Sequence, residues 1–442
     1  MEVPSHTGDV ENGTKLAGTS RSADIILQPG QPSSPPKENM AAWIQVLGAF
    51  ILNLNTWGIM HAYGAFQAFY QLNLLQETQS SSIAWIGSTQ AFLLFLISLA
   101  AGPLFDAGYL RGLLWTGSFL LVIGTFLLSI TRVYWQIFLT QALMTGLGLG
   151  CLYLPAPAVV SQYFHARTAL AMGASSTGSA IGGIIYPIIF HQLQLMFGFG
   201  WATRVLAFIL LATSAIPVLL MKSKALPKPT RSLVDHTAIK DAPYMVFSLG
   251  MFFEIMGFYI VLYYIELLAL ARTNTSPSLA AYLLVIINAA SLPGHLIPGY
   301  YADRVGSIHV QIAVAIASVV LTLSLLVVHS SAGLIVFSVL YGFMNGAFMG
   351  LPAAGVMSLS SDKSKIGTRL GMTLTLLGFG MLVSNPIAGA ILGRDGNWVG
   401  LIVWCGSLLA ASSISLITLL GLAGMDVRSY LTTNLPCARM PD

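Results

Sequence analysis

Long apolar stretches separated by short polar segments run through most of the chain. Twelve such stretches can be marked, at about 43–70, 82–105, 111–130, 133–161, 168–196, 201–221, 243–271, 279–301, 309–329, 331–360, 367–393 and 398–424. Most of them reach the ~20 residues that an α-helix needs to cross a bilayer. Backbone polar groups in lipid must be hydrogen-bonded within the protein, so apolar segments of this length are predicted to be helices. The pattern therefore predicts an all-α polytopic membrane protein with twelve transmembrane helices.

Composition and charge agree with a protein that lies in lipid. Only 8% of the residues are charged and 55% are apolar, whereas a soluble domain carries about 25% charged residues. If both termini lie inside, sixteen of the twenty Lys and Arg residues are on the inner side, and Arg132, Arg204, Arg272 and Arg394 are on the outer side. This bias predicts that the termini and the middle loop are cytoplasmic. The net charge of +4 then reflects topology and does not indicate nucleic-acid binding.

The chain is predicted to divide into five segments. Residues 1–40 are polar and rich in Pro, Ser and Gly, so we expect a disordered cytoplasmic tail. Residues 41–221 and 243–424 each hold six predicted spans, and residues 222–242, rich in Lys and Pro, are predicted to be a cytoplasmic linker between these halves. Residues 425–442 form a second predicted cytoplasmic tail.

The two halves share a sequence motif at the end of their second apolar segment. A Gly-x-x-x-Asp pattern occurs at residues 102–106 and again at 299–303, so that an offset of 197 relates Asp106 to Asp303. The same offset relates Pro155 to Pro352. Two six-helix halves repeated in parallel are the arrangement of the major facilitator fold, whose substrate site lies between the halves near the bilayer midplane.

Several stretches resemble one branch of that superfamily, the fungal monocarboxylate-porter-like proteins. They are residues 42–50, 55–58, 85–93, 102–106, 163–173, 178–187 and 298–306. The resemblance implies a carrier of an organic acid or related small metabolite that works by alternating access. Lactate carriers of this family use a lysine in the first span and an Asp and Arg in the eighth, whereas the matching positions here hold His61, Ser291 and His295. The fixed central cation is therefore missing.

Glu254 and His61 are the candidates for proton coupling. Glu254 lies near the middle of the seventh span, where an ionised carboxylate costs about 2.5–3.5 kcal/mol on insertion scales. His61 shares a helix face with Asn53 and Trp57, and the repeat offset places Glu254 at the level of position 57. We expect the two ionisable groups to lie at similar depths and to relay a proton. The alternatives are a neutral Glu254 bonded to a neighbouring span and a His61 held by a serine or a backbone carbonyl.

Polar and aromatic side chains within the spans are candidates for binding the substrate. They are Asn53, Asn55, Trp57, His61, Tyr259, Asn288, His295, Asn345 and Asn385. Side chains of these types also form hydrogen bonds between membrane helices, which is the alternative role for each of them.

A gate is predicted on the cytoplasmic side. Asp106 lies close to Arg111, and Asp303 is next to Arg304, at the inner ends of related spans; Arg167 lies in the fourth loop. Each aspartate is expected to bond the positive N-terminal end of a neighbouring helix. These residues are predicted to close the inner side of the transporter.

The sequence contains no Gly-x-Ser-x-Gly, His-Glu-x-x-His or Walker motif and no cluster of metal ligands, so we expect neither an enzyme nor an ATP-driven pump, and no cofactor. We predict a proton-linked carrier of a small molecule that acts as a monomer in a lipid bilayer, in the plasma membrane or in a vacuolar or other internal membrane. Export of a secondary metabolite is the leading interpretation. Uptake of a monocarboxylate or vitamin-like nutrient, and a non-transporting receptor, are the alternatives.

Asn274 begins a glycosylation sequon on the predicted outer side.

Overall fold

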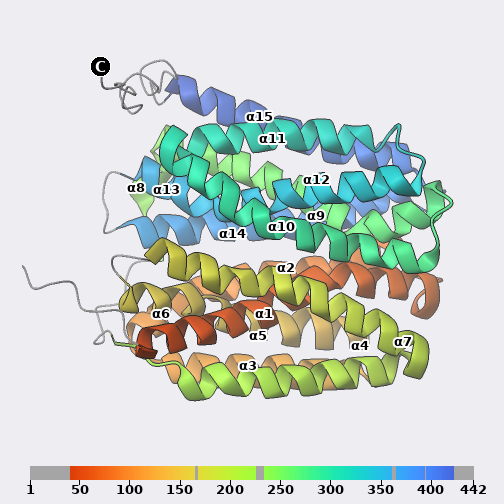
Figure 1. The fold of residues 1–442 in the computed structure, drawn as a ribbon, viewed down its shortest axis with the longest axis horizontal. Coiled ribbons are helices and arrows are strands. Elements are labelled where there is room, and N and C mark those ends of the chain that lie inside the picture. The colour runs from red at the N-terminus through yellow and green to blue at the C-terminus, as the bar shows by residue number, and fades with distance from the viewer. Residues whose placement is uncertain (1–39, 165–167, 225–232, 361–364, 394, 423–442) are drawn as a thin grey trace, which may run out of the picture. The chain divides into compact units, whose positions relative to one another are not determined.

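The computed structural model describes residues 40–164, 168–224, 233–360, 365–393 and 395–422, without the side chains of 168–170 and 303. The predicted tails therefore lie outside the described residues, apart from Met40 of the first. Helices account for nearly all of the described chain, and it contains no strand. The fold is all-α, as the apolar pattern predicted (Figure 1).

The first group of helices precedes the linker. It comprises α1 (Met40–Phe69) with a π-helical turn at Tyr70–Leu74, α2 (Ser80–Asp106), α3 (Leu110–Leu128), α4 (Tyr134–Ile137), a π-helical segment (Phe138–Thr145), α5 (Gly146–Tyr153), α6 (Pro155–Tyr163) and α7 (Thr168–Leu220). The second group comprises α8 (His236–Ile239), α9 (Ala242–Arg272), α10 (Pro277–Val305), α11 (Ser307–Ser324), α12 (Ser331–Gly350), α13 (Pro352–Leu359), α14 (Ile366–Leu392) and α15 (Trp398–Leu422).

Eleven helices in the described residues are long and apolar enough to cross a membrane, one fewer than the twelve predicted spans. The difference lies in α7, which runs through both the fifth and the sixth predicted span. Gly198 interrupts α7 with φ 78° and ψ 172°, a left-handed conformation that glycine adopts without a steric penalty. The predicted spans 168–196 and 201–221 are therefore two helical segments of α7, and they are joined by a turn at Gly198.

Two prolines related by the repeat offset occupy the same structural position. Pro155 is the first residue of α6 and Pro352 is the first residue of α13. Proline suits this position because it has no N–H to donate and its φ is already helical. The fourth and tenth predicted spans are each divided at this proline, into α5 and α6 and into α12 and α13.

Helices within each group pack closely through glycines. On α1, a Cβ added at Gly58 would lie 2.7 Å from the Cα of Gly182 on α7. Likewise, a Cβ added at Gly294 of α10 would lie 3.1 Å from the Cα of Gly346 on α12. Small residues at membrane-helix interfaces allow such an approach, which strengthens van der Waals packing.

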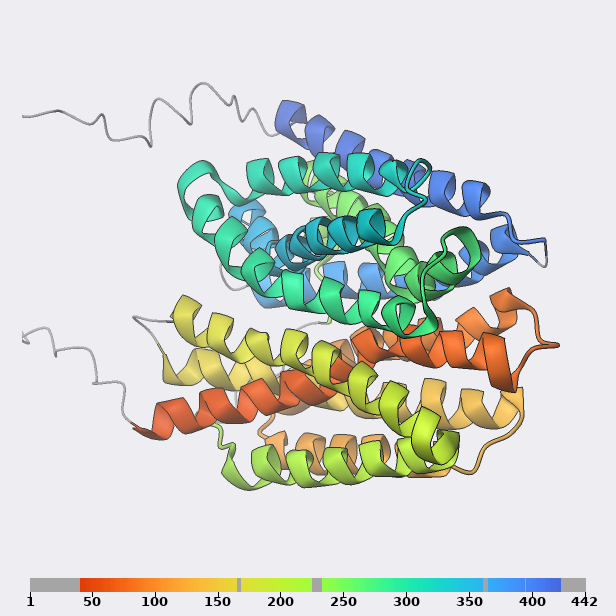
Figure 2. The ribbon, with the colours of Figure 1, turned by 45° about the vertical axis from the view of Figure 1, so that its right-hand side comes forward.

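The two groups meet mainly along three helix pairs, α2 with α14, α7 with α10, and α1 with α9, and α1 also contacts α10. Figure 2 shows α1–α7 and α9–α15 as two sets of helices. The α1–α9 pair lies at the centre of the region predicted to bind the substrate. The predicted domain boundaries at 221 and 243 remain predictions, and the described part of the linker contains the short helix α8.

Candidate functional site

An aromatic cluster joins α1 to α9, α2 and α5. The imidazole of His61 stacks on the ring of Tyr259, with 6.4 Å between centroids and 16° between planes. Trp57, one turn before His61, contacts that imidazole at 5.9 Å and meets the edges of Phe95 and Tyr153 at 6.0 and 5.5 Å. The cluster thus connects side chains from both helix groups.

The cluster continues along α9 through a pair of tyrosines. Tyr259 meets Tyr263 at 6.0 Å, and Tyr263 lies 4.8 Å from the ring of Tyr63 on α1. Tyr63 lies over Gly87 of α2, where an added Cβ would lie only 2.1 Å from a carbon of the phenol ring, and the Tyr63 hydroxyl donates to the carbonyl of Ile83 at 2.9 Å. The sequence analysis missed Tyr63, and the small residue Gly87 is the signal that such a ring could lie there.

Several polar atoms of the cluster are buried without a hydrogen-bond partner among the described residues. They are Nδ1 of His61 and the hydroxyl oxygens of Tyr259 and Tyr263. Buried polar groups in folded proteins are nearly always hydrogen-bonded, to protein or to ordered water. These three atoms around one aromatic cluster therefore keep hydrogen-bonding capacity that the described residues do not use.

Glu254 is turned toward another part of the second helix group. Its Oε2 accepts hydrogen bonds from Nε2 of Gln311 on α11 at 2.8 Å and from Oγ of Ser412 on α15 at 3.2 Å. Tyr259 follows five residues later on α9, which is about 140° around a helix of 3.6 residues per turn. Because Tyr259 faces His61, Glu254 faces away from it. The structure does not bring the predicted Glu254–His61 pair together. Oε2 of Glu254 is bonded to neighbouring helices, whereas its Oε1 is buried without a partner among the described residues, and its role in proton coupling stays a prediction.

Asn53 and Asn55 connect α1 to α7. The amide of Asn55 donates to Oγ of Ser214 at 3.0 Å, and its Oδ1 accepts from the hydroxyls of Tyr186 and Thr213 at 2.8 and 3.0 Å. Nδ2 of Asn53 donates to the carbonyl of Ser175 at 3.1 Å. These bonds use the side chains to hold α1 against α7 on both sides of the Gly198 turn.

The two candidate residues on α10, Asn288 and His295, both bond main-chain carbonyls. Nδ2 of Asn288 donates to the carbonyl of Gly183 on α7 at 2.9 Å, and the missing side chain of Gly183 makes room for this amide. Nδ1 of His295 lies 2.7 Å from the carbonyl of Ser291, so Nδ1 carries the proton in this bond. Asn288 therefore contributes to the contact between the two helix groups.

Asn345 of α12 and Asn385 of α14 retain unused polar atoms. Oδ1 of Asn345 and both side-chain polar atoms of Asn385 are buried without a partner among the described residues, as is Oδ1 of Asn288. The main-chain carbonyl of Asn385 accepts from the hydroxyl of Tyr264 at 3.4 Å. Like the aromatic cluster, these amides have buried polar atoms that form no hydrogen bond with the described residues.

The predicted cytoplasmic gate is described in part. Asp106 is the last residue of α2, Arg111 lies in the first turn of α3, and the guanidinium of Arg304 lies 4.2 Å over the ring of Tyr300. Arg167 and the side chain of Asp303 lie outside the described residues. The gating role of these residues stays a prediction, as does glycosylation at Asn274, which is exposed between α9 and α10.

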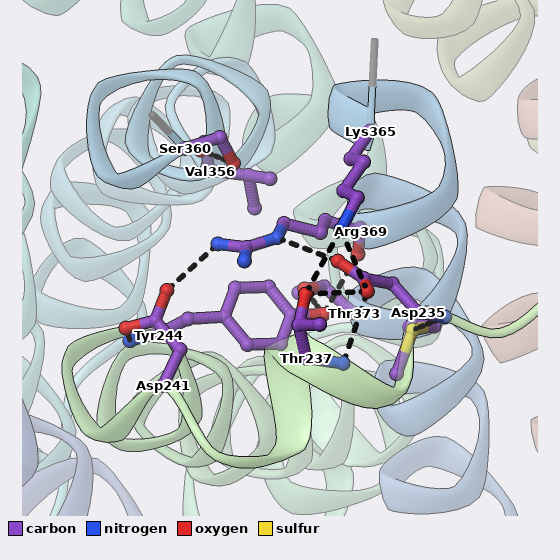
Figure 3. Close-up of polar contacts among 10 residues, drawn as sticks. Asp235, Thr237, Asp241, Tyr244, Val356, Ser360, Lys365, Arg369 and Thr373 are labelled. Atoms are coloured by element: carbon purple, nitrogen blue, oxygen red, sulfur yellow. Dashed lines mark hydrogen bonds and ion pairs between the residues drawn. The ribbon is translucent and has the colours of Figure 1, made fainter. Parts of the chain in front are cut away.

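A charged cluster that the sequence analysis missed fixes the linker to α14 (Figure 3). Nε of Arg369 lies 3.2 Å from Oδ2 of Asp235, and its Nη1 lies 2.8 Å from Oδ2 of Asp241. Lys365 lies 3.5 Å from Asp235, and the hydroxyl of Tyr244 donates to the carbonyl of Arg369 at 2.8 Å. Both aspartates cap the start of a helix, α8 for Asp235 and α9 for Asp241, and this capping pattern is readable in the sequence.

Asp235 is held in its ionised form. The hydroxyl and backbone N–H of Thr237 donate to its Oδ1, at 2.6 and 3.0 Å, and Arg369 donates to its Oδ2. The hydrogen bond from the Thr237 hydroxyl, followed by those from the Thr237 backbone and Arg369 and the charge of Lys365, outweighs burial and lowers the pKa of Asp235 below its ordinary value. A carboxylate that stays charged therefore fixes the linker to the first turn of α14.

Comparisons with known proteins agree with this architecture. Residues 40–245 match the family model described as Major Facilitator Superfamily. The chain is 43% identical over 83% of its length to the MFS-type transporter dbaD of Emericella nidulans, of which 83% is covered. It is 34% identical over 86% of its length to the aspyridones efflux protein apdF of the same organism, of which 78% is covered. The crystal structure of tetrameric PepTSo2 shares the fold, with a TM-score of 0.63 and 14% identity over 88% of this chain and 98% of that one.

Proposed function

Because the chain belongs to the major facilitator superfamily and is a multi-pass membrane transporter of a small molecule rather than an enzyme, we propose that it exports an organic secondary metabolite. The export is coupled to proton movement and proceeds by alternating access. The direction is supported by the relative apdF, which is named as an efflux protein and is 34% identical over 86% of this chain. The proposed location is the plasma membrane, where export removes the product from the cell.

The observation that carries the proposed cargo is the cluster of His61, Tyr259 and Tyr263, in which one polar atom of each side chain is buried without a partner among the described residues. Ligand sites are mostly apolar, with a few polar groups that fix orientation. Trp57 and the tyrosine rings offer flat surfaces for an aromatic or conjugated ring. The cluster contains no Lys or Arg, so it lacks the fixed positive charge that would capture a small carboxylate. A larger, partly apolar organic acid or neutral metabolite fits it better.

The remaining candidate residues divide into two roles in this proposal. Asn345, Asn385 and His295 extend the set that contacts the cargo. Asn53, Asn55 and Asn288 hold helices in place, because their amides are already bonded to α7. For the proton, Glu254 and His61 are proposed to act separately, since their side chains face different helices.

Metabolite profiling of deletion and overexpression strains tests the proposal. Deletion of an exporter raises the amount of its cargo inside the cell and lowers it in the medium, and overexpression does the reverse. Uptake of a nutrient would give the opposite signs. If the identified metabolite binds to the protein in reconstituted vesicles but is not moved across the membrane, the protein is a receptor and not a carrier.

A further inference from the structure

A cavity of about 160 Å³ with a mostly apolar lining lies where α1 and α9 end and α10 begins, at the end of the bundle away from α8 (Figure 1). Both helix groups line it, through α1 with its π-helical turn and α7 on one side and α9 and α10 on the other. Glu266, His191, Asn73 and Gln194 are its polar side chains, and the others are apolar. On the positive-inside topology this is the outer side of the protein.

Glu266 is half-buried on α9, and its Oε2 is fully buried with no hydrogen-bond partner among the described residues. It is the only carboxylate in the lining of the cavity, and the lining contains no Lys or Arg. An ionised carboxylate in this position lacks the compensation that a buried charge requires. A protonated one has no charge to compensate.

A contact between the two helix groups lies beside the cavity, next to its lining residue His191. Nε2 of Gln192 on α7 donates to the hydroxyl of Tyr282 on α10 at 2.9 Å, and the rings of His191 and Tyr282 lie 6.3 Å apart. This contact must break if α7 and α10 separate at the outer end. Water would then reach Glu266 and stabilise its ionised form.

The other titratable groups around the cavity are few. His191 faces it from α7, and Tyr282 of α10 contacts His191. Arg272, at the end of α9, is bonded to the carbonyls of Leu325 and Leu326 at 3.1 and 3.2 Å, which places its charge on the loop after α11. The lining residues of α1 and its π-helical turn include no titratable group.

We propose that Glu266 is a proton-binding site that controls closure of the outer end of the transporter. Closure brings the carboxyl into a cavity without a partner and favours its protonated form, whereas opening hydrates it and favours the ionised form. A ligand that binds one state better shifts the equilibrium toward it, and here the ligand is a proton taken from outside water. The O–H bond that forms on Glu266 is the only covalent change. The inference rests on the proposed alternating access and is independent of the cargo.

This site gives a direction to the proton in an exporter. After the cargo leaves, a proton from outside binds Glu266, the outer end closes, and the carrier returns to the state that takes up cargo from the cytoplasm. Proton entry and cargo exit are then linked by one equilibrium between two conformations.

The test measures the opening of the outer end in the full-length chain, with protons as the only added ligand. Cys151, Cys405 and Cys437 are replaced by Ser, and spin labels are attached after the substitutions Met196→Cys and Ser278→Cys. Both label positions are exposed and adjoin residues that line the cavity. Distances between the labels are recorded by pulsed electron resonance in vesicles from about pH 5 to about pH 8, the range used to detect physiological titrations. We expect the ratio of short to long distances to fall as pH rises, by at most about tenfold per pH unit for one proton.

Substitutions assign this response to Glu266. Glu266→Gln, which resembles the protonated acid, should keep the labels at the short distance at every pH, and Glu266→Asp should retain a pH response. Glu77→Gln is the matched control, because Glu77 is an exposed carboxylate at the same end that does not line the cavity, and it should behave as the unsubstituted chain does. An unchanged response in Glu266→Gln overturns the proposal, and so does a response that disappears only in His191→Gln.

The proton site and the proposed export can fail independently of each other. If cells export no metabolite but the label distances depend on pH through Glu266, the export proposal fails and the proton site stands. If export occurs and Glu266→Gln leaves the pH response intact, only the proton site fails.

Discussion

The imidazole of His61 stacks on the ring of Tyr259, with 6.4 Å between their centroids. This contact joins α1 of the first helix group to α9 of the second, and the two side chains leave a nitrogen and a hydroxyl buried without partners among the described residues. A contact of this kind must change when the two groups move against each other. In the proposed function, this contact is where cargo binding and alternating access are coupled.

The Tyr259 hydroxyl gives the first prediction. Tyr259→Phe keeps the stacked ring and removes a hydroxyl that has no partner among the described residues, so thermal stability should be unchanged. If the hydroxyl bonds the cargo, the loss of one hydrogen bond of about 0.5–1.5 kcal/mol should weaken apparent affinity by roughly twofold to tenfold. Tyr263→Phe removes the neighbouring hydroxyl, so it shows whether the change in affinity depends on which of the two hydroxyls is lost. Concentration-dependent export of the metabolite identified by profiling measures both, and equal affinity in Tyr259→Phe and the unsubstituted chain would remove this hydroxyl from the site.

The second prediction concerns Glu254. One substitution keeps the shape of its side chain without the charge, and another removes both. Glu254→Gln retains an oxygen that can accept from Gln311 and Ser412, so the protein should fold. Glu254→Ala leaves both donors buried without an acceptor and should destabilise the protein by about 1–3 kcal/mol for each. If Glu254 carries a proton during transport, flux in Glu254→Gln should respond less to a pH gradient than flux in the unsubstituted chain. Flux with an unaltered pH response would leave Glu254 as a bonding residue between α9, α11 and α15.

The two glutamates of α9 show how far the sequence could predict the site. Long apolar segments must be helices in lipid, so the fold followed from pattern alone, and the repeat located Pro155 and Pro352 at equivalent helix starts. The repeat offset also predicted the depth of Glu254, but depth does not determine which way a side chain faces. Facing depends on helix rotation, which is set by packing against neighbours such as Gln311 of α11 and Ser412 of α15. For the same reason, the contacts of Asn55 and the stack of Tyr259 on His61 required the structure.

The approach of α1 to α7 gives the third prediction. A Cβ at Gly58 would lie 2.7 Å from the Cα of Gly182, where backbone would have to move. Gly58→Ala should therefore separate the two helices, lower the unfolding temperature and reduce the amount of protein in the membrane. Gly112→Ala is a suitable control, because a Cβ there would meet no atom within 4 Å. Equal unfolding temperatures for the two variants, measured by fluorescence in detergent, would contradict the close packing.

The cluster at α14 gives the fourth prediction. Arg369 contacts both Asp235 and Asp241, and its side chain is 8% exposed, whereas that of Lys365 is 40% exposed and pairs with only one of these carboxylates, Asp235. Arg369→Gln should release the linker from α14 and lower the unfolding temperature. Lys365→Gln should have a smaller effect, because exposed ion pairs contribute little. Limited proteolysis of the linker measures the release, and equal cleavage rates in the two variants would count against a fastening role for Arg369.

The pH dependence of this fastening follows from Asp235. Hydrogen bonds from Thr237 and Arg369 lower its pKa, so the carboxylate contributes stability above its unfolded pKa of about 3.9, and this contribution is lost as pH falls through the lower folded pKa. From about pH 5 to about pH 8 the cluster stays charged, and any pH response of transport in that range must come from other groups. The difference in unfolding temperature between the unsubstituted chain and Asp235→Asn should be constant over that range and shrink only below about pH 4. A difference that changes near neutral pH would show that the linker, and not the helices that line the cargo site, responds to protons.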